Sequence, residues 1–153
     1  MRSSLIFGAA VLLLISVGCG EEYFSTPEKT LQHYVKNRMM GSRQEYEAVL
    51  NSFTRDDRSW WDDHYLRLCT ALYGKDCPGQ GLPTETTIWT DKFEPAGPRT
   101  DEVEKSEIDE DKGTATLTVQ GQDIEFVKER GNWKMVGMFG MQEELEDQYP
   151  QIR

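Results

Sequence analysis

The sequence predicts an α+β domain in which N-terminal helices pack on a curved antiparallel sheet. Two observations support this class. Up to about residue 74, apolar residues recur at the three- and four-residue spacing of amphipathic helices. After residue 83 the period changes to two, and short turns rich in glycine separate the segments. Helices followed by strands are typical of a helical layer that covers one face of a sheet.

Three helices are expected in the first half of the chain. The first begins at Thr26–Pro27, where Ser25 or Thr26 can cap the helix, Pro27 fits the first turn and Glu28 favours the positive helix end. Ser42 and Glu45 resemble a capping box at the start of the second. The third runs from about Arg55 to Gly74. The expected apolar stripes are Leu31, Tyr34, Val35 and Met39, then Tyr46, Val49, Leu50 and Phe53, then Trp61, Tyr65, Leu68 and Leu72.

Strands are expected after the loop Cys77–Pro83, whose two prolines and two glycines break the helical pattern. The last three strand segments should form an antiparallel meander because only tight turns separate them. A short closing helix is expected at Met141–Asp147. The predicted strand segments are Thr84–Phe93, Glu102–Ile108, Thr114–Gln120, Asp123–Glu129 and Asn132–Phe139.

The first 19 residues have the pattern of an export signal. Arg2 precedes an apolar run from Leu5 to Val17, and Gly18 and Cys19 follow. The run is about 13 residues long, whereas a helix needs roughly 20 to span a bilayer. It therefore predicts the apolar region of a secretory signal, and a short anchor that stays attached is the alternative.

Ser16–Cys19 resembles the lipobox of bacterial lipoproteins. Gly18 and Cys19 match its most diagnostic positions, whereas Ser16 departs from the aliphatic residue that is usual there. The resemblance implies cleavage before Cys19 and a triacylated cysteine, and two or more acyl chains hold a protein stably in a membrane. The expected organisation is a signal peptide (1–18), a lipidated tether (19–25), a single α+β domain (26–147) and a polar tail (148–153). The implied location is the bacterial cell envelope. Because Gly20 is not aspartate, the outer membrane is favoured in a Gram-negative cell.

The charge balance excludes one class of partner. The chain has 27 acidic and 17 basic residues and a formal net charge of −10. Such a surface is repelled by nucleic acid, and also by anionic lipid head groups. The charges are spread along the chain, which is typical of a solvated surface. The expected partners are the membrane, through the anchor, and an envelope protein or a small apolar ligand.

The two cysteines beyond Cys19 predict a disulfide between Cys69 and Cys77, because export leads to an oxidising compartment. A metal pair is the alternative, but His64 is the nearest histidine and no second ligand pair with zinc-like spacing follows. Asp109–Gly113 resembles the start of a calcium loop, but a strand pattern follows it, so a hairpin turn is expected. No metal and no cofactor are predicted.

Aromatic residues supply the remaining candidate contacts. Trp61 and Trp133 are assigned to the core, whereas Trp60 and Trp89, if exposed, are candidates for contact with a ligand or partner. His64, beside Trp60 among acidic residues, is a third candidate contact, although a boundary position in a charged helix is its simplest interpretation. The sequence has no phosphate-binding glycine loop, HExxH, GxSxG or CxxC motif, so no catalytic residue is assigned.

The helix start Thr26–Leu31 (TPEKTL), a second short helix and the strand segment Glu129–Lys134 (ERGNWK) resemble the nuclear-transport-factor-2-like superfamily. More narrowly, they are similar to small bacterial lipoproteins of unknown function within it. The resemblance covers roughly residues 26–140, and the segment Cys69–Pro83 departs from the pattern. It implies a cone-shaped, cystatin-like fold with a pocket between sheet and helices. Some members are isomerases or dehydratases that use Asp and His there, and others only bind ligands or have lost the pocket.

These observations favour a lipid-anchored binding or interaction module without enzymatic activity. The first alternative is a small-molecule isomerase or dehydratase of the same fold, with His64 or an inward-facing Asp as the base. That enzyme would require a deep apolar pocket with a carboxylate or imidazole at its floor. The second alternative is a structural protein that maintains the envelope through a protein partner, which predicts an exposed aromatic patch.

Overall fold

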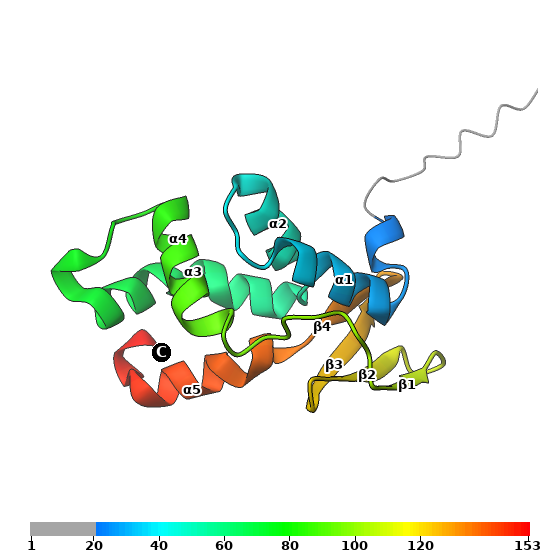
Figure 1. Cartoon of the computed structure of the whole chain (residues 1–153). Coiled ribbons are helices and arrows are strands. Elements are labelled where there is room, and N and C mark those ends of the chain that lie inside the picture. Colours follow the sequence, from blue (N-terminus) through cyan, green and yellow to red (C-terminus); the bar gives the residue numbers. More distant parts are fainter. Residues whose placement is uncertain (1–20) are drawn as a thin grey trace, which may run out of the picture.

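Helices and strands form separate parts of the molecule in the computed structural model, which describes residues 21–153 (Figure 1). The predicted signal peptide (1–18) and Cys19 lie outside the described residues. The predicted α+β class is confirmed. The helices are α1 (Pro27–Asn37), α2 (Arg43–Asn51), α3 (Arg55–Tyr73), α4 (Leu82–Ile88) and α5 (Met141–Gln148). The strands are β1 (Lys105–Asp109), β2 (Thr114–Val119), β3 (Gln122–Glu129) and β4 (Asn132–Met135).

The four strands form one antiparallel meander in the order β1-β2-β3-β4, so the predicted meander is confirmed. Leu117 pairs with Ile124 across the β2–β3 ladder, and Phe126 pairs with Met135 across β3–β4. All four side chains are buried, because alternate residues of a strand point to one face. β1 carries mainly exposed residues, as is usual for a strand at the edge of a sheet.

Helix α1 lies against the sheet. Thr26 caps it by accepting a hydrogen bond from the backbone N–H of Lys29, and Leu31 and Tyr34 are buried. The Thr30 hydroxyl donates to the Trp133 carbonyl at 2.9 Å and so links α1 to β4. A 3₁₀ turn, Glu21–Phe24, precedes α1 and buries its phenylalanine. Most of the segment expected as a tether (19–25) is therefore folded onto the domain.

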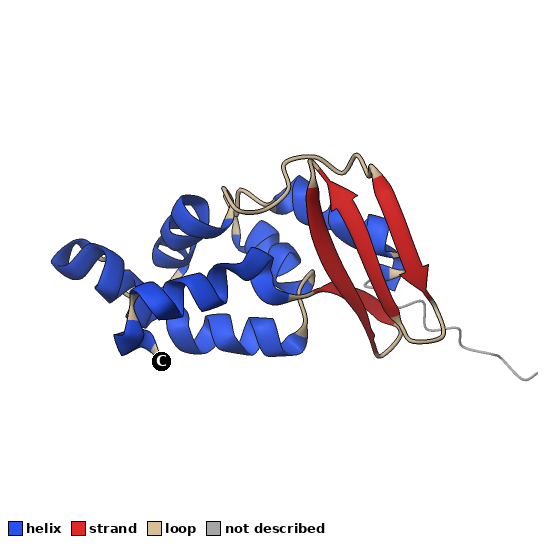
Figure 2. Ribbon diagram, turned by 90° about the horizontal axis from the view of Figure 1, so that it is seen from below, coloured by secondary structure: helices blue, strands red, loops and turns tan. Residues whose placement is uncertain are grey.

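The segment Thr84–Phe93 was predicted as a strand, and that prediction is wrong. It forms α4 and a π-helical turn, Trp89–Phe93. The buried residues at 84, 85, 88, 89 and 93 follow helical spacing and face the core. Burial of that helical face outweighs the preference of its threonines, Ile88 and Trp89 for strands. With α2, α3 and α5, this segment builds a helical lobe beside the sheet (Figure 2).

The strand predicted at Asn132–Phe139 is shorter than expected. β4 ends at Met135, and Gly137–Gly140 follow with φ angles of 81°, 44°, 61° and 77°. Four consecutive residues in the left-handed region turn the chain from the sheet into α5. The two that are not glycine, Met138 and Phe139, each cost roughly 1–2 kcal/mol in this conformation. The terminal segment expected as a polar tail (148–153) includes the 3₁₀ turn Pro150–Ile152 and buries its isoleucine.

The left-handed turn is held by a buried carboxylate, that of Asp57 in the first turn of α3. Its oxygens accept hydrogen bonds from the Gly137 N–H at 3.0 Å, the Gln142 amide at 3.0 Å and the Thr54 hydroxyl at 2.6 Å. The backbone beside it is paired as well, because the Met135 N–H donates to the Ser52 carbonyl at 2.8 Å. These bonds join the end of the sheet to the helical lobe.

Replacing Asp57 with asparagine is expected to lower the free energy of unfolding by about 2–4 kcal/mol. The amide carries no charge and leaves at least one buried donor without an acceptor. The matched control is Asp56→Asn in the same helical turn, where the side chain is exposed and the cost should stay below about 1 kcal/mol. Urea unfolding measures both. Equal losses for the two variants would contradict the role given to Asp57.

Candidate functional site

Trp60 and His64 form a stacked pair on α3. Their ring centroids are 4.7 Å apart with planes at 7°. The Trp60 indole donates to Glu146 of α5 at 2.7 Å. His64 Nδ1 lies 2.7 Å from the Trp60 carbonyl, which can only accept, so this nitrogen carries the proton. Both rings are partly exposed, and the pair links α3 to α5.

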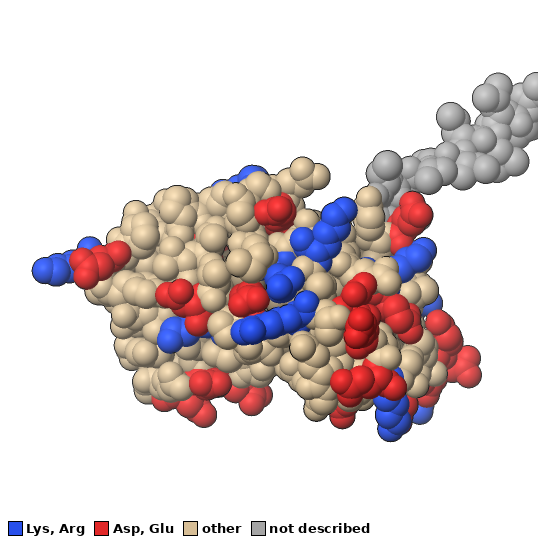
Figure 3. Space-filling view, in the orientation of Figure 1, with Lys and Arg blue, Asp and Glu red and all other residues tan. Residues whose placement is uncertain are grey.

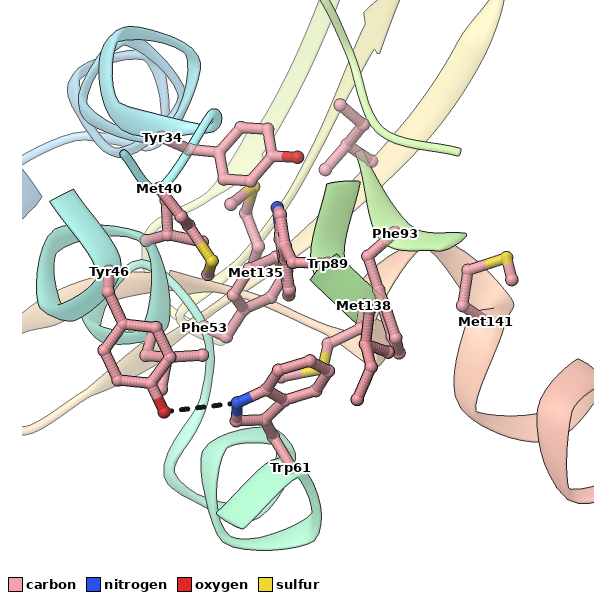
Figure 4. Close-up of a cluster of buried hydrophobic side chains, with 14 of the residues drawn as sticks. Tyr34, Met40, Tyr46, Phe53, Trp61, Trp89, Phe93, Met135, Met138 and Met141 are labelled. Atoms are coloured by element: carbon pink, nitrogen blue, oxygen red, sulfur yellow. Dashed lines mark hydrogen bonds between the residues drawn. The ribbon is translucent and has the colours of Figure 1, made fainter. Parts of the chain in front are cut away.

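Trp89 is fully buried, so it is excluded as a surface contact. Its ring stacks on that of Phe93, with the ring centroids 5.1 Å apart. It also makes edge-to-face contacts with Trp61 and Phe53, at centroid distances of 5.6 Å and 5.8 Å. The helical turn that replaces the predicted strand points Trp89 inward, into the cluster of rings shown in Figure 4. Tyr34 of α1 packs against Trp89, and Phe139 of the left-handed turn packs against Tyr34. Aromatic side chains therefore fill the space between the helices.

A buried polar network crosses the base of this cluster. The Trp61 indole donates to the Tyr46 hydroxyl at 3.3 Å (Figure 4), and that hydroxyl donates to Glu85 Oε1 at 3.2 Å. Arg43 lies 3.5 Å from Glu85 Oε2 and stacks over the Tyr46 ring. Burial raises the pKa of Tyr46; the nearby Glu85 carboxylate also raises it, whereas the Trp61 hydrogen bond opposes the rise. The phenol therefore keeps its proton and acts as a donor.

The sequence analysis missed this network. Its members come from three helices, α2, α3 and α4, so no short motif contains them. The available signal was the spacing of Glu85, Trp89 and Phe93, each four residues apart, which would have indicated a helix with one buried face.

The Tyr34 hydroxyl is buried without a hydrogen-bond partner among residues 21–153. Burial raises its pKa, the Glu94 carboxylate raises it further, and Arg38 opposes the rise. Gly97 covers this hydroxyl closely, since a Cβ atom there would lie 2.5 Å from the tyrosine oxygen and 2.7 Å from Phe139. Glycine is therefore required at this position for the chain to close over the ring cluster.

A surface hollow of about 860 Å³ lies along α3. Leu66, which is 39% exposed, and Arg67 belong to its lining on α3. Gln80 comes from the loop after α3 and Gln151 from the C-terminal turn. A disulfide between Cys69 and Cys77, whose Cα atoms are 5.5 Å apart, ties that loop to α3. These are the two cysteines that the sequence analysis pairs.

The described residues show no metal centre and no membrane-spanning helix. Between residues 21 and 153, no group of three or more His, Cys, Asp or Glu side chains is placed to hold a metal ion. Of the helices in this range, none is long and apolar enough to cross a membrane. The hollow on α3 and the partly exposed Trp60–His64 pair are surface features of the described residues.

The two buried tyrosines should respond in opposite ways to loss of the hydroxyl. Tyr34→Phe is expected to change the free energy of unfolding by less than about 0.5 kcal/mol or to stabilise the protein, because the hydroxyl has no partner to lose. Tyr46→Phe should cost about 1–3 kcal/mol, since it leaves Trp61 and Glu85 without their partner. Chemical unfolding of both variants tests this, and a larger loss for Tyr34→Phe would refute the assignment.

Comparison with known proteins identifies no relative for this chain: no family model, no curated protein and no solved structure matches it.

Proposed function

We propose that the protein is a lipid-anchored lipoprotein of the cell envelope that acts as a binding module without enzymatic activity. The observation that carries the proposal is the filled interior. An enzyme of the alternative kind needs a deep apolar pocket, and that space is occupied by the rings of Tyr34, Phe53, Trp61, Trp89 and Phe139. Recognition then falls to the surface.

The relative positions of the N-terminus and the hollow support an anchored binding module. The turn Glu21–Phe24 lies at the end of the molecule with α1 and the sheet (Figure 1). The disulfide loop and the C-terminal turn, which line the hollow, lie at the opposite end. A chain anchored at Cys19 would therefore present the hollow on α3 away from the membrane and toward an envelope protein. A structural role in envelope maintenance would use the same surface.

The fold is proposed to be a variant of the cone-shaped, cystatin-like fold of the nuclear-transport-factor-2-like superfamily. Three helices followed by an antiparallel meander support this relationship. In this variant α4 and its π-helical turn bring Trp89 and Phe93 into the interior, where other members have a pocket.

Intact mass of the protein purified from its own membrane tests the anchor. The expected mass begins at a triacylated Cys19 and rises by about 2 Da on reduction, as the Cys69–Cys77 bridge opens. A mass that begins at an unmodified residue would refute the anchor. A mass that does not change on reduction would refute the bridge in the native protein, and the two results are independent.

Site-specific photo-crosslinking in intact cells tests the binding surface. A photoreactive residue in place of Leu66 is expected to give a discrete adduct with an envelope protein, because this side chain lines the hollow. The control position is Ile108 on β1, which is similarly exposed, at 43% against 39%, and lies at the other end of the molecule. Failure to crosslink at 66, or the same adduct from both positions, would contradict the proposal.

A further inference from the structure

A second, smaller hollow lies beside the start of the described chain. It has a volume of about 270 Å³ and lies between the turn Glu21–Phe24 and α1. Three of its six lining residues have basic side chains, and one is acidic. The lining is Glu22, Tyr23, Lys29, Gln32, His33 and Lys36.

The basic side chains share one face of α1, hereafter the basic face (Lys29, His33 and Lys36). Their spacing of four and three residues places them in a row along the helix. Both lysines are exposed, and neither forms an ion pair with a carboxylate among residues 22–153. The His33 ring is held in place by Tyr23, which stacks on it at 4.7 Å, and by Phe24 at 5.3 Å.

Lysines outnumber carboxylates in the lining of this hollow, two to one, although the whole chain is acidic. The pKa of His33 is lowered by burial first, and then by the positive charges of Lys36 and Lys134. Figure 3 shows basic side chains over α1, both acidic and basic side chains next to the grey N-terminal residues, and further acidic side chains over the sheet. A chain with a net charge of −10 thus carries a positive face next to its N-terminal end.

We propose that the basic face binds the phosphate of an anionic phospholipid in the membrane that holds the anchor, so that α1 faces the bilayer. The proposal rests on the anchor at Cys19. The turn that lines the hollow begins at Glu21, and two residues of chain reach at most about 7 Å. The headgroup layer of one leaflet is roughly 5–8 Å thick. The tether therefore keeps the start of the turn that lines the hollow within the headgroup layer.

Two further features fit a lipid surface. Tyr23 is 52% exposed at the rim of the hollow, and tyrosine is enriched at membrane interfaces, where its ring lies among the head groups. Each lysine near an anionic leaflet contributes roughly fivefold in affinity. The two lysines would offset part of the repulsion that the acidic sheet experiences and would turn the sheet away from the bilayer.

Lysine footprinting tests the contact. The full protein from its own membrane is reconstituted in vesicles of phosphatidylcholine, or of phosphatidylcholine with 30% phosphatidylglycerol, and its amines are acetylated. Lys29 and Lys36 should react about three- to tenfold more slowly in the anionic vesicles. Lys112, whose side chain is 78% exposed at the β1–β2 turn, should change less than twofold. Equal reactivity of Lys29 and Lys36 in both vesicles would overturn the proposal. So would equal protection by 10 mM inorganic phosphate alone, which would indicate a site for free phosphate.

Paired charge variants separate a local contact from the net charge. Lys29→Gln/Lys36→Gln should abolish the slowing of amide hydrogen exchange that anionic vesicles cause over residues 21–37. Lys105→Gln/Lys112→Gln removes the same charge from β1 and the turn that follows it, and this variant should retain the slowing. Equal loss in both variants would overturn the proposal.

Flotation on vesicles of pure phosphatidylcholine tests the anchor separately, because these vesicles hold no anionic lipid for the basic face to bind. If the protein does not float, footprinting with added anionic vesicles still decides the contact.

Discussion

The carboxylate of Asp57 is the interaction on which the arrangement of sheet and helices depends. It accepts hydrogen bonds from the left-handed turn, from α5 and from the residue that caps α3. The turn contains Met138 and Phe139 in a backbone region that is unfavourable for residues other than glycine. Charge-assisted bonds inside the protein offset that cost. They fix the direction in which the chain leaves β4 and, together with the Trp60–Glu146 hydrogen bond, they join α5 to α3.

The ring cluster depends on that turn. Phe139 contacts Tyr34 and Phe53 because the turn brings it back over the core. Rings from α1, α3 and the π-helical turn then fill the space that a ligand would need. The network of Trp61, Tyr46 and Glu85 satisfies most of the buried polar groups at its base, and such a network favours a single arrangement of the helices around it. The same packing stabilises the helical lobe and fills its interior.

Charge is distributed unevenly over the folded chain. The edge strand and its turns are acidic, whereas α1 presents lysines beside the N-terminal turn (Figure 3). At physiological salt, charges act over about 8 Å, so a nearby membrane responds to this local face and only weakly to the net charge. An anionic membrane can therefore repel the chain as a whole and still attract this one face. An anchor that holds the positive end near the bilayer would orient the remaining surface outward.

By itself, the sequence determined the local elements. The caps Thr26 and Ser42, the alternation in β2 and β3 and the glycine-containing turns predict the helix starts and the meander, because these signals act between residues close in the chain. Tertiary structure decided the rest. Thr84–Phe93 is helical because packing of one face outweighs strand propensity. Asp57 acquires its role from groups that only folding brings together, and no pattern in the linear chain encodes that proximity.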